Sequence, residues 1–174
     1  MSSDTEILDN AFGDIGGLSG LTIFDAGPEG IVSKYLAERI GDGRIIGVNI
    51  WLEAYNKIRE KVGDKLMGNL VFIKDDMRNI NYIKDNFFDL IVCYDTLISI
   101  ETMTPGATLS ILRQFYRILK HGGQFLAIEH PFLKEVKPVN KAQELNLSSG
   151  KFYVKSGTKN LVKVRIDPSN CLRS

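Results

Sequence analysis

The stretch LTIFDAGPEGIVSKYLAERI, residues 21–40, decides the fold of this chain. Apolar and β-branched residues run into Asp25, a glycine-containing turn follows, and Ile31, Tyr35, Leu36 and Ile40 then recur on one helical face. A strand, a tight glycine turn and a helix in this order open an α/β ligand site. Glycines let the backbone approach a ligand closely, and in such sheets the ligand lies beyond the carboxyl ends of the strands.

The rest of the chain repeats this alternation of strand and helix. The near-continuous apolar run FDLIVCY, residues 88–94, is typical of a parallel strand covered on both faces. The pattern predicts an α/β fold, doubly wound in three α/β/α layers around a mainly parallel sheet. The expected strands are residues 21–25, 44–48, 69–73, 88–94 and 124–129; the expected helices are 29–40, 52–62 and 106–119; 95–105 is expected to be a loop and 120–123 a turn.

The C-terminal part has a different pattern. Two β-rich runs, residues 151–155 and 161–166, flank the turn sequence SGTKN and predict an antiparallel hairpin at one edge of the sheet. A short helix is expected near residues 140–147. We interpret the chain as a single domain, with a lead-in over 1–20 that holds a short helix at 6–12, a core over 21–131 and a shortened C-terminal part over 132–174.

Composition narrows the class of protein. The 174 residues carry a formal net charge of +1, which argues against strong non-specific affinity for DNA or membranes. No apolar run reaches the ~18 residues of a membrane span, and the acidic N-terminus has no signal-peptide core. Two cysteines make no disulfide framework or metal cluster, and Cys93 is expected to be a small buried hydrophobe. These features predict a cytoplasmic protein without a metal site.

The charge is unevenly distributed along the chain. Residues 134–174 hold nine Lys or Arg and three Asp or Glu, a net charge of +6, so that the preceding residues carry −5. Such a segment is either solvated surface or a contact for an acidic or nucleic-acid partner. In the second case Lys155, Lys159 and Lys163 are the candidate contact residues.

Five blocks now point to a family: FDAGPEG, IIGVNI, KDDMRNI, NFFDLIVCYDTL and ILRQFYRILKHGGQFLAIEH. In order and spacing they resemble class I S-adenosylmethionine-dependent methyltransferases, and most of all the subgroup that acts on small molecules and quinones. The resemblance covers residues 21–131. It implies a Rossmann-like methyltransferase fold, S-adenosylmethionine as cofactor and transfer of a methyl group to an acceptor by direct in-line displacement.

The resemblance also implies a cofactor site. The turn from Ala26 to Gly30 would meet the amino-acid end of the cofactor, with Asp25 supporting the turn, and Asn49 would accept hydrogen bonds from the ribose. Ile50 would pack on the adenine face. The implied cofactor-binding residues are Asp25, Ala26, Gly27, Gly30, Asn49, Ile50, Asp76, Met77 and Tyr94.

The resemblance assigns adenine recognition and catalysis to residues that follow the third, fourth and fifth strands. Asp76, with the Met77 backbone, would read the adenine edge. Tyr94 and Asp95 would face the sulfonium and the acceptor. The candidate acid or base groups are Tyr94, Asp95, Glu129 and His130, of which His130 follows the fifth strand.

Two features depart from the family pattern. The family turn has the form D-x-G-x-G-x-G, whereas DAGPEG is one residue shorter and lacks the middle glycine. Asn49 stands where the family has Asp or Glu, which removes a charge-assisted contact worth ~1–2 kcal/mol, or roughly tenfold in affinity. Glu29 at the helix start would repel a pyrophosphate, so it argues against a dinucleotide.

Structural alternatives remain open for several of these residues. Gly27 and Gly30 could merely allow the tight turn without touching a ligand, and the only role of Asp25 could be to cap that turn. Asp76 could cap a helix instead of reading adenine. Trp51 is either packing at the sheet edge or an adenine platform. Asp89 is expected to hold the start of the fourth strand, and His121 to be exposed in a turn.

The departures also leave the activity open. A methyltransferase-like fold that has lost catalysis, acting as a binding module or partner subunit, is the alternative to an active enzyme. A nicotinamide oxidoreductase is disfavoured because no G-x-G-x-x-G follows the first strand.

Overall fold

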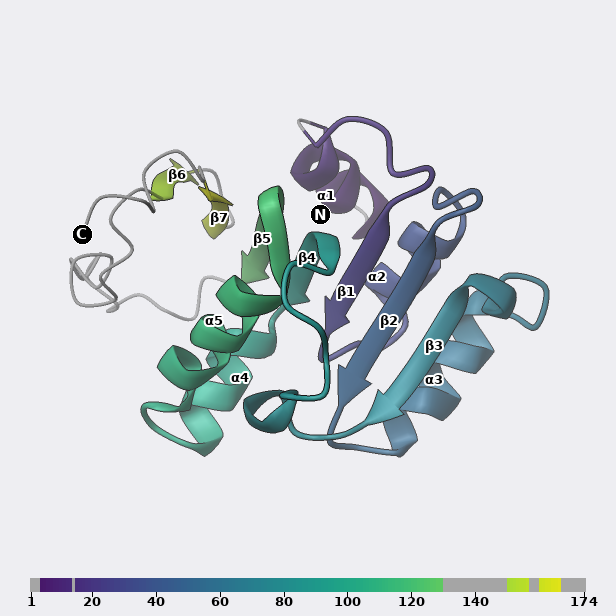
Figure 1. The fold of residues 1–174 in the computed structure, drawn as a ribbon. Helices are drawn as coiled ribbons and strands as arrows, with labels where there is room; N and C mark the ends of the chain where they lie inside the picture. The colour runs from purple at the N-terminus through teal and green to yellow at the C-terminus, as the bar shows by residue number, and fades with distance from the viewer. Residues whose placement is uncertain (1–3, 14, 130–149, 157–159, 167–174) are drawn as a thin grey trace.

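A computed structural model describes residues 4–13, 15–129, 150–156 and 160–166 (Figure 1). The helices are α1 (Asp4–Phe12), α2 (Ile31–Ala37), α3 (Glu53–Val62), α4 (Thr96–Met103) and α5 (Ala107–Ile118), with 3-10 turns η1 (Met67–Asn69) and η2 (Met77–Asn79). The strands are β1 (Thr22–Ala26), β2 (Arg44–Asn49), β3 (Leu70–Lys74), β4 (Phe88–Tyr94), β5 (Leu119–Glu129), β6 (Gly150–Ser156) and β7 (Asn160–Ile166).

The strands of the described segments form one sheet in the order β3-β2-β1-β4-β5-β7-β6. The first five run parallel, and the hairpin of β6 and β7 adds antiparallel to β5. The doubly wound fold with an edge hairpin is therefore confirmed. Because the chain leaves β1 to one side for β2 and later returns to the other side for β4, the topological switch point lies between β1 and β4.

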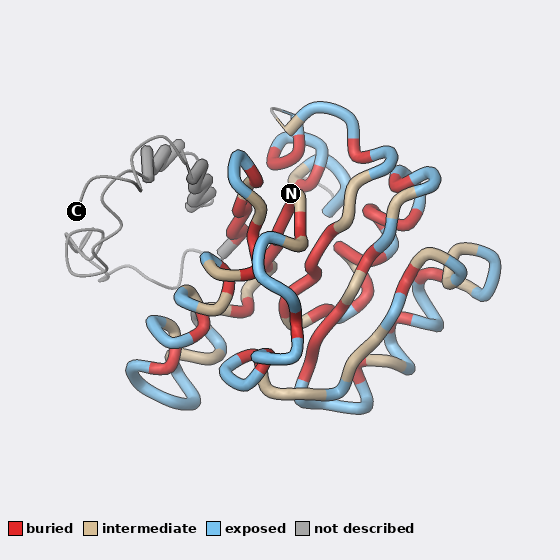
Figure 2. The backbone as a smooth tube through the Cα atoms, viewed as in Figure 1, coloured by how far each residue is buried: buried red, intermediate tan, exposed pale blue. Residues whose placement is uncertain are grey.

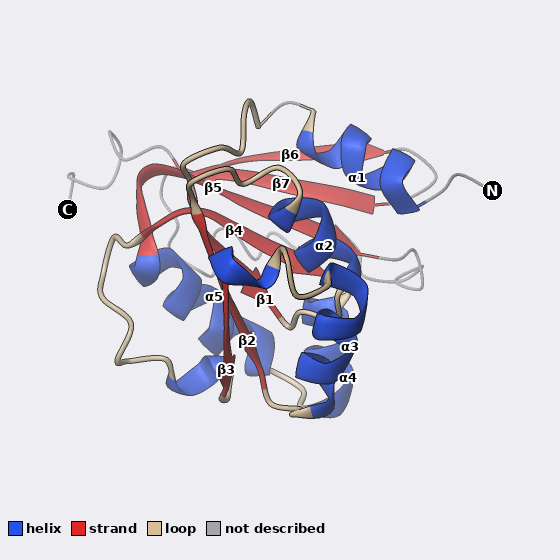
Figure 3. Cartoon of the chain, turned by 90° about the vertical axis from the view of Figure 1, so that its right-hand side faces the viewer, coloured by secondary structure: helices blue, strands red, loops and turns tan. Residues whose placement is uncertain are grey.

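Two apolar cores cover the two faces of the sheet, which is why neighbouring residues of β1 are both fully buried. Ile23 points into a core with α1, α2 and α3, whereas Phe24 points into a core with η2 and α5. Phe24 makes edge contacts with the rings of Phe88 and Phe115. Cys93 is fully buried in this second core, as expected. Figure 2 shows the buried central strands, and Figure 3 shows helices on both sides of the sheet.

The prediction of a loop over residues 95–105 is wrong, because α4 occupies residues 96–103. Leu97 and Ile100 give this short segment an apolar face that packs against the second core. The carboxylate of Glu101 then accepts hydrogen bonds from the backbone amides of Gly106 and Thr108, which joins α4 to the start of α5.

The prediction of a turn over residues 120–123 is also wrong, since β5 already begins at Leu119. Leu119 pairs with Phe88, and the register shifts before Gln124 pairs with Leu90, so an irregular strand replaces the turn. His121 is exposed as expected but lies in this strand. Helix α2 is shorter than the predicted 29–40, whereas β4 has the predicted bounds.

Asp89 holds the start of β4, as expected. Its Oδ2 accepts a hydrogen bond from the backbone amide of Thr22 at 2.9 Å, and its Oδ1 accepts one from Lys120 Nζ at 2.7 Å. Three strands, β1, β4 and β5, are thus joined at their amino ends.

Asp89→Ala is expected to lower the free energy of unfolding by about 1–2 kcal/mol, because the partly buried Thr22 amide loses its acceptor. Urea denaturation measures this change. The matched control is Asp64→Ala, which removes a carboxylate that is 81% exposed from its pair with Arg59 and is expected to leave stability nearly unchanged. Equal effects of the two changes would contradict the role of Asp89.

Three expectations fall on residues outside the described ranges: the helix near 140–147, His130 and Lys159. Of the helices in the described parts of the chain, none has both the length and the apolarity to cross a membrane.

Candidate functional site

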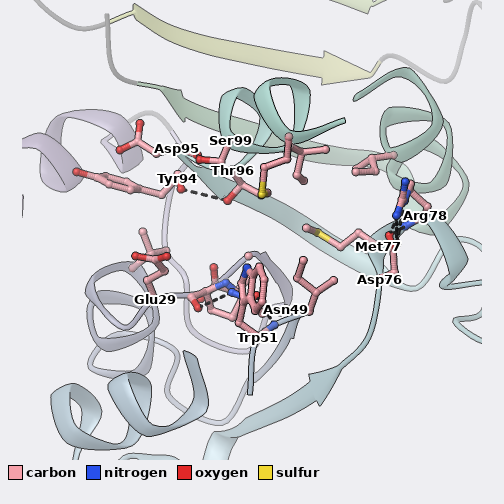
Figure 4. Close-up of a pocket in the computed structure, with 18 of the residues that line it drawn as sticks. Glu29, Asn49, Trp51, Asp76, Met77, Arg78, Tyr94, Asp95, Thr96 and Ser99 are labelled. Carbon is pink, nitrogen blue, oxygen red and sulfur yellow. Dashed lines mark hydrogen bonds and ion pairs between the residues drawn. The ribbon is translucent and has the colours of Figure 1, made fainter. Parts of the chain in front are cut away.

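A cavity of about 260 Å³ opens beyond the carboxyl ends of β1, β2 and β4, at the switch point of the sheet (Figure 4). Its walls come from the turn after β1, the loop after β2, η2 and α4. The lining residues are Asp25, Gly27, Pro28, Glu29, Ile31, Val32, Asn49, Ile50, Trp51, Asp76, Met77, Arg78, Tyr94, Asp95, Thr96, Ser99, Ile100, Met103, Thr104 and Ile111. The cavity thus brings together seven of the nine predicted cofactor-binding residues; Ala26 and Gly30 do not line it.

Gly27 lines the cavity at the turn after β1, and we call this part of the lining the floor. It has a φ of 68°, and its amide donates to the Val48 carbonyl at 2.9 Å. A Cβ at this position would lie 2.7 Å from Thr96 Cγ2 and Oγ1. Thr96 in turn donates a hydrogen bond from Oγ1 to the Ala26 carbonyl at 2.7 Å. The first turn of α4 therefore lies directly against the glycine turn, which only a residue without a side chain permits.

No local sequence pattern indicates Thr96, because its contact with the turn depends on the pairing of β1 with β4, far apart in the chain. Gly30, which the resemblance assigns to the cofactor, does not line the cavity. Its Cβ position faces α3, 2.9 Å from Lys61 Cδ and 3.1 Å from the Lys57 carbonyl oxygen, at a φ of 103°. Gly30 therefore lets α3 pack closely against the turn.

Pro28 lies over β2 at the only glycine of that strand. A Cβ on Gly47 would be 2.8 Å from Pro28 Cγ, so the turn fits against β2 because Gly47 has no side chain.

Asp25 lies buried below the turn, 2% exposed, and accepts a hydrogen bond from Ser33 Oγ of α2 at 2.6 Å. Burial raises the pKa of the Asp25 carboxyl to about 6, and the Ser33 hydrogen bond partly opposes this rise. The hydrogen bond from Ser33 joins β1 to α2, and Asp25 is one of the residues that line the cavity.

Asn49 is the last residue of β2 and is 7% exposed. Its Nδ2 donates to the Pro28 carbonyl at 3.2 Å, and its Oδ1 accepts from the Trp51 amide at 3.0 Å. The amide therefore joins the glycine turn to the loop that follows β2. Its side chain lies at the cavity wall, as Figure 4 shows.

Ile50 and Trp51 lie at the cavity rim with exposed fractions of 40% and 56%. Trp51 is only partly packed against the protein, because more than half of its surface is exposed. Two large apolar side chains at the mouth of a cavity are typical of a surface that a flat aromatic ligand covers.

Asp76 caps η2, which confirms the helix-cap alternative. Its Oδ1 accepts from the Arg78 amide at 2.9 Å, and both carboxylate oxygens accept from the Arg78 guanidinium. The hydrogen bond from Arg78 lowers the pKa of Asp76. Because Arg78 occupies both oxygens, Asp76 is less available to an adenine amine than expected. Met77, beside it, is buried and lines the cavity.

Tyr94, Asp95 and Ser99 lie on the opposite side of the cavity from the Asp76–Arg78 pair (Figure 4). Asp95 precedes α4 in the left-handed conformation, with a φ of 52°, which is uncommon outside glycine. Burial, and next the nearby Asp95 carboxylate, raise the pKa of the Tyr94 hydroxyl. The Glu129 side chain and His130 lie outside the described structure, so the geometry brings together only Tyr94 and Asp95 of the candidate acid or base groups.

The cavity lining is strongly acidic. Four carboxylates line it, from Asp25, Glu29, Asp76 and Asp95, whereas the one basic lining residue among the described residues, Arg78, is paired with Asp76. Such a lining favours a cationic ligand over an anionic one. Within the described ranges no group of three or more His, Cys, Asp or Glu side chains is arranged to hold a metal ion.

Solved structures share this fold. A SAM-dependent methyltransferase from Aquifex aeolicus is 20% identical with a TM-score of 0.70, over 94% of this chain and 89% of that one. N-methyltransferase NodS from Bradyrhizobium japonicum, in complex with S-adenosyl-L-homocysteine, is 15% identical with a TM-score of 0.68, over 95% and 85%. An rRNA methylase from Streptococcus thermophilus is 13% identical with a TM-score of 0.67, over 96% and 98%.

At such identities the likeness concerns the fold. No curated protein matches the chain in sequence. The family model described as a methyltransferase domain matches residues 25–123, more than half of the chain. The chain therefore belongs to the methyltransferase domain family.

Proposed function

We propose that the protein is an S-adenosylmethionine-dependent methyltransferase that binds its cofactor in the cavity beyond β1, β2 and β4. The observation that carries this proposal is the acidic cavity at the switch point, floored by a glycine whose Cβ position is filled by Thr96. S-adenosylmethionine has a cationic sulfonium and an ammonium group, which this lining suits, whereas a dinucleotide pyrophosphate would meet Glu29. Membership of the methyltransferase family supports the same cofactor.

The residues present fit the parts of this cofactor. Asp25, Gly27 and Glu29 would hold its amino-acid end, through two carboxylates and the open backbone of the turn. Asn49 would lie beside the ribose. The adenine would be held by apolar side chains at the rim and wall, namely Ile50, Trp51 and Met77.

When bound, S-adenosylmethionine would supply a methyl group on a sulfonium sulfur; the nucleophile of the acceptor would bond to the methyl carbon, and the sulfur would leave as the thioether of S-adenosylhomocysteine. The chain itself then has to position the acceptor and exclude water. Tyr94 and Asp95 lie at the end of the cavity away from Arg78, where they can orient an acceptor. Where the acceptor must lose a proton, the Asp95 carboxylate is the base that the described residues offer there.

The acceptor side of the cavity is formed by α4. Ser99, Ile100, Met103 and Thr104 make a mixed polar and apolar wall, which suits an acceptor with an apolar body and one polar group. This composition supports the small-molecule type of methyltransferase, with quinone-like compounds as one class to test.

Formation of S-adenosylhomocysteine tests the activity. The purified protein is incubated with S-adenosylmethionine and, separately, with a small-molecule extract, total RNA and a protein fraction, and the product is measured by chromatography. We expect turnover with the small-molecule extract and none for the Gly27→Ala variant. Cofactor binding without turnover on any fraction would instead support an inactive binding module.

A macromolecular partner is a second, separable proposal that rests on the C-terminal charge. Reversing Lys155, Lys159 and Lys163 to Glu is expected to weaken binding to an acidic partner such as RNA by tenfold or more at low salt, since each lysine lost removes one phosphate contact. A filter-binding titration measures this, with reversal of the exposed Lys65, Lys74 and Lys84 as the control. Unchanged RNA binding, or equal losses for both sets, would contradict the proposal.

A further inference from the structure

Both polar atoms of the Asn49 side-chain amide, Nδ2 and Oδ1, make hydrogen bonds to the backbone. The Pro28 carbonyl can only accept a hydrogen bond and the Trp51 amide can only donate one, so the orientation of the Asn49 amide is fixed. Only a side chain with one donor and one acceptor satisfies both groups. A carboxylate has no donor, and the family acid therefore could not make this pair of contacts.

These contacts concern the part of the turn that is shortened. Pro28 lies on Gly47 of β2, with its Cγ 2.8 Å from where a Cβ of Gly47 would lie, and its carbonyl accepts from Asn49 at the end of the same strand. The turn is therefore fixed against β2 by packing on one residue and by a hydrogen bond to another. On the other side, the Thr96 side chain lies against Gly27.

We propose that Asn49 is a positioning residue matched to the shortened turn, and that Asp at this position weakens cofactor binding instead of strengthening it. This inference rests on the proposed function for its affinity prediction. Its structural part, the joining of Pro28 to the loop after β2, can be tested without any ligand.

The physical reason is that Asp at position 49 replaces a hydrogen bond to the Pro28 carbonyl with repulsion between two oxygen atoms. In Asn49→Asp a carboxylate oxygen would face the Pro28 carbonyl oxygen at the present 3.2 Å donor–acceptor distance, and both atoms carry negative charge. The turn or the side chain must then move. The movement displaces the floor of the cavity, and it also disturbs Trp51, whose amide depends on the same side chain.

The test uses Asn49→Asp and Asn49→Ala, with Asn69→Asp as the matched control. Asn69 also donates from Nδ2 to a backbone carbonyl, that of Gly41 at 2.6 Å, but it does not line the cavity. Trp51 is the only tryptophan of the chain, so its fluorescence reports on the site directly. Cofactor affinity is measured by calorimetry with S-adenosylhomocysteine, at a temperature where urea titration shows every variant to be folded.

We expect Asn49→Asp to bind about tenfold more weakly than the wild type, close to Asn49→Ala, and Asn69→Asp to bind like the wild type. Without ligand, Trp51 emission should shift in both Asn49 variants and stay unchanged in Asn69→Asp. Equal or tighter binding by Asn49→Asp, with unchanged emission, would overturn the inference and assign Asn49 to direct ribose contact. If the wild type binds no cofactor, the proposed function fails, and the emission of Trp51 alone still decides the structural part.

Discussion

Gly27→Ala is expected to lower the free energy of unfolding by about 2–4 kcal/mol and to abolish measurable cofactor binding. The alanine would have to adopt a φ of 68°, which costs ~1 kcal/mol, and its Cβ would lie 2.7 Å from two atoms of Thr96, an overpacking that costs ~1–3 kcal/mol. Relief of this contact moves α4, and with it Tyr94 and Asp95. The cavity therefore loses its floor and its acceptor wall together.

Urea denaturation and a calorimetric titration measure the two effects. The matched control is Gly122→Ala, because Gly122 has a similar φ of 76° but no atom within 4 Å of its Cβ position. This control isolates the cost of the backbone conformation. Wild-type cofactor affinity in a stable Gly27→Ala protein would contradict the assignment of Gly27 to the floor of the cofactor site.

Asp25 is expected to make stability depend on pH between about 4 and 6. Its pKa in the folded chain is raised to about 6 from 3.8, so the folded state holds the extra proton in this window. The stabilising contribution is fully present below the unfolded pKa and is lost as pH rises through the folded pKa. For a shift of this size the loss is about 3 kcal/mol.

Asp25→Asn should remove this dependence, since an amide oxygen can still accept from Ser33 Oγ and does not ionise. The measurement is the free energy of unfolding of wild type and variant from pH 4 to pH 8, and the difference between them is expected to change by about 3 kcal/mol in favour of the variant. Asp64→Asn, at an exposed carboxylate, is the control. Parallel curves for wild type and Asp25→Asn would contradict the buried, titrating carboxyl.

The same group links cofactor binding to pH. A cationic ligand favours the charged carboxylate, so affinity for S-adenosylmethionine should rise as pH increases through 6 and binding should release a proton. Between pH 5 and pH 7 the gain is expected to be about tenfold, and Asp25→Asn should lose it. Calorimetry in two buffers of different ionisation enthalpy measures the released proton.

The sequence predicted the sheet because apolar strands and glycine turns alternate with helical patterns, and these are local signals. It failed at α4 because residues 95–105 mix polar and apolar residues without a clear periodicity, and the helix starts from a left-handed Asp95. Tertiary packing of Leu97 and Ile100, which no local pattern reveals, stabilises this helix.

The sequence pattern locates cavity-lining residues at strand ends and misses those that depend on contacts between distant segments. Gly27, directly after β1, and Asn49, the last residue of β2, were assigned to the site from the strand pattern, and both line the cavity. Thr96 was not, because it meets the turn only through the pairing of β1 with β4. Gly30 was assigned to the ligand on its position in the motif, whereas the approach of α3 explains it.

Binding of S-adenosylmethionine in the acidic cavity is tested by a calorimetric titration of the wild-type protein. S-adenosylmethionine, S-adenosylhomocysteine and NAD are titrated at pH 7.5, and Trp51 fluorescence is followed in parallel to place any binding at the cavity. We expect micromolar binding of the first two with a change in Trp51 emission, and no binding of NAD. Absence of binding up to millimolar cofactor, or equal binding of NAD, would rule out this cofactor for the cavity.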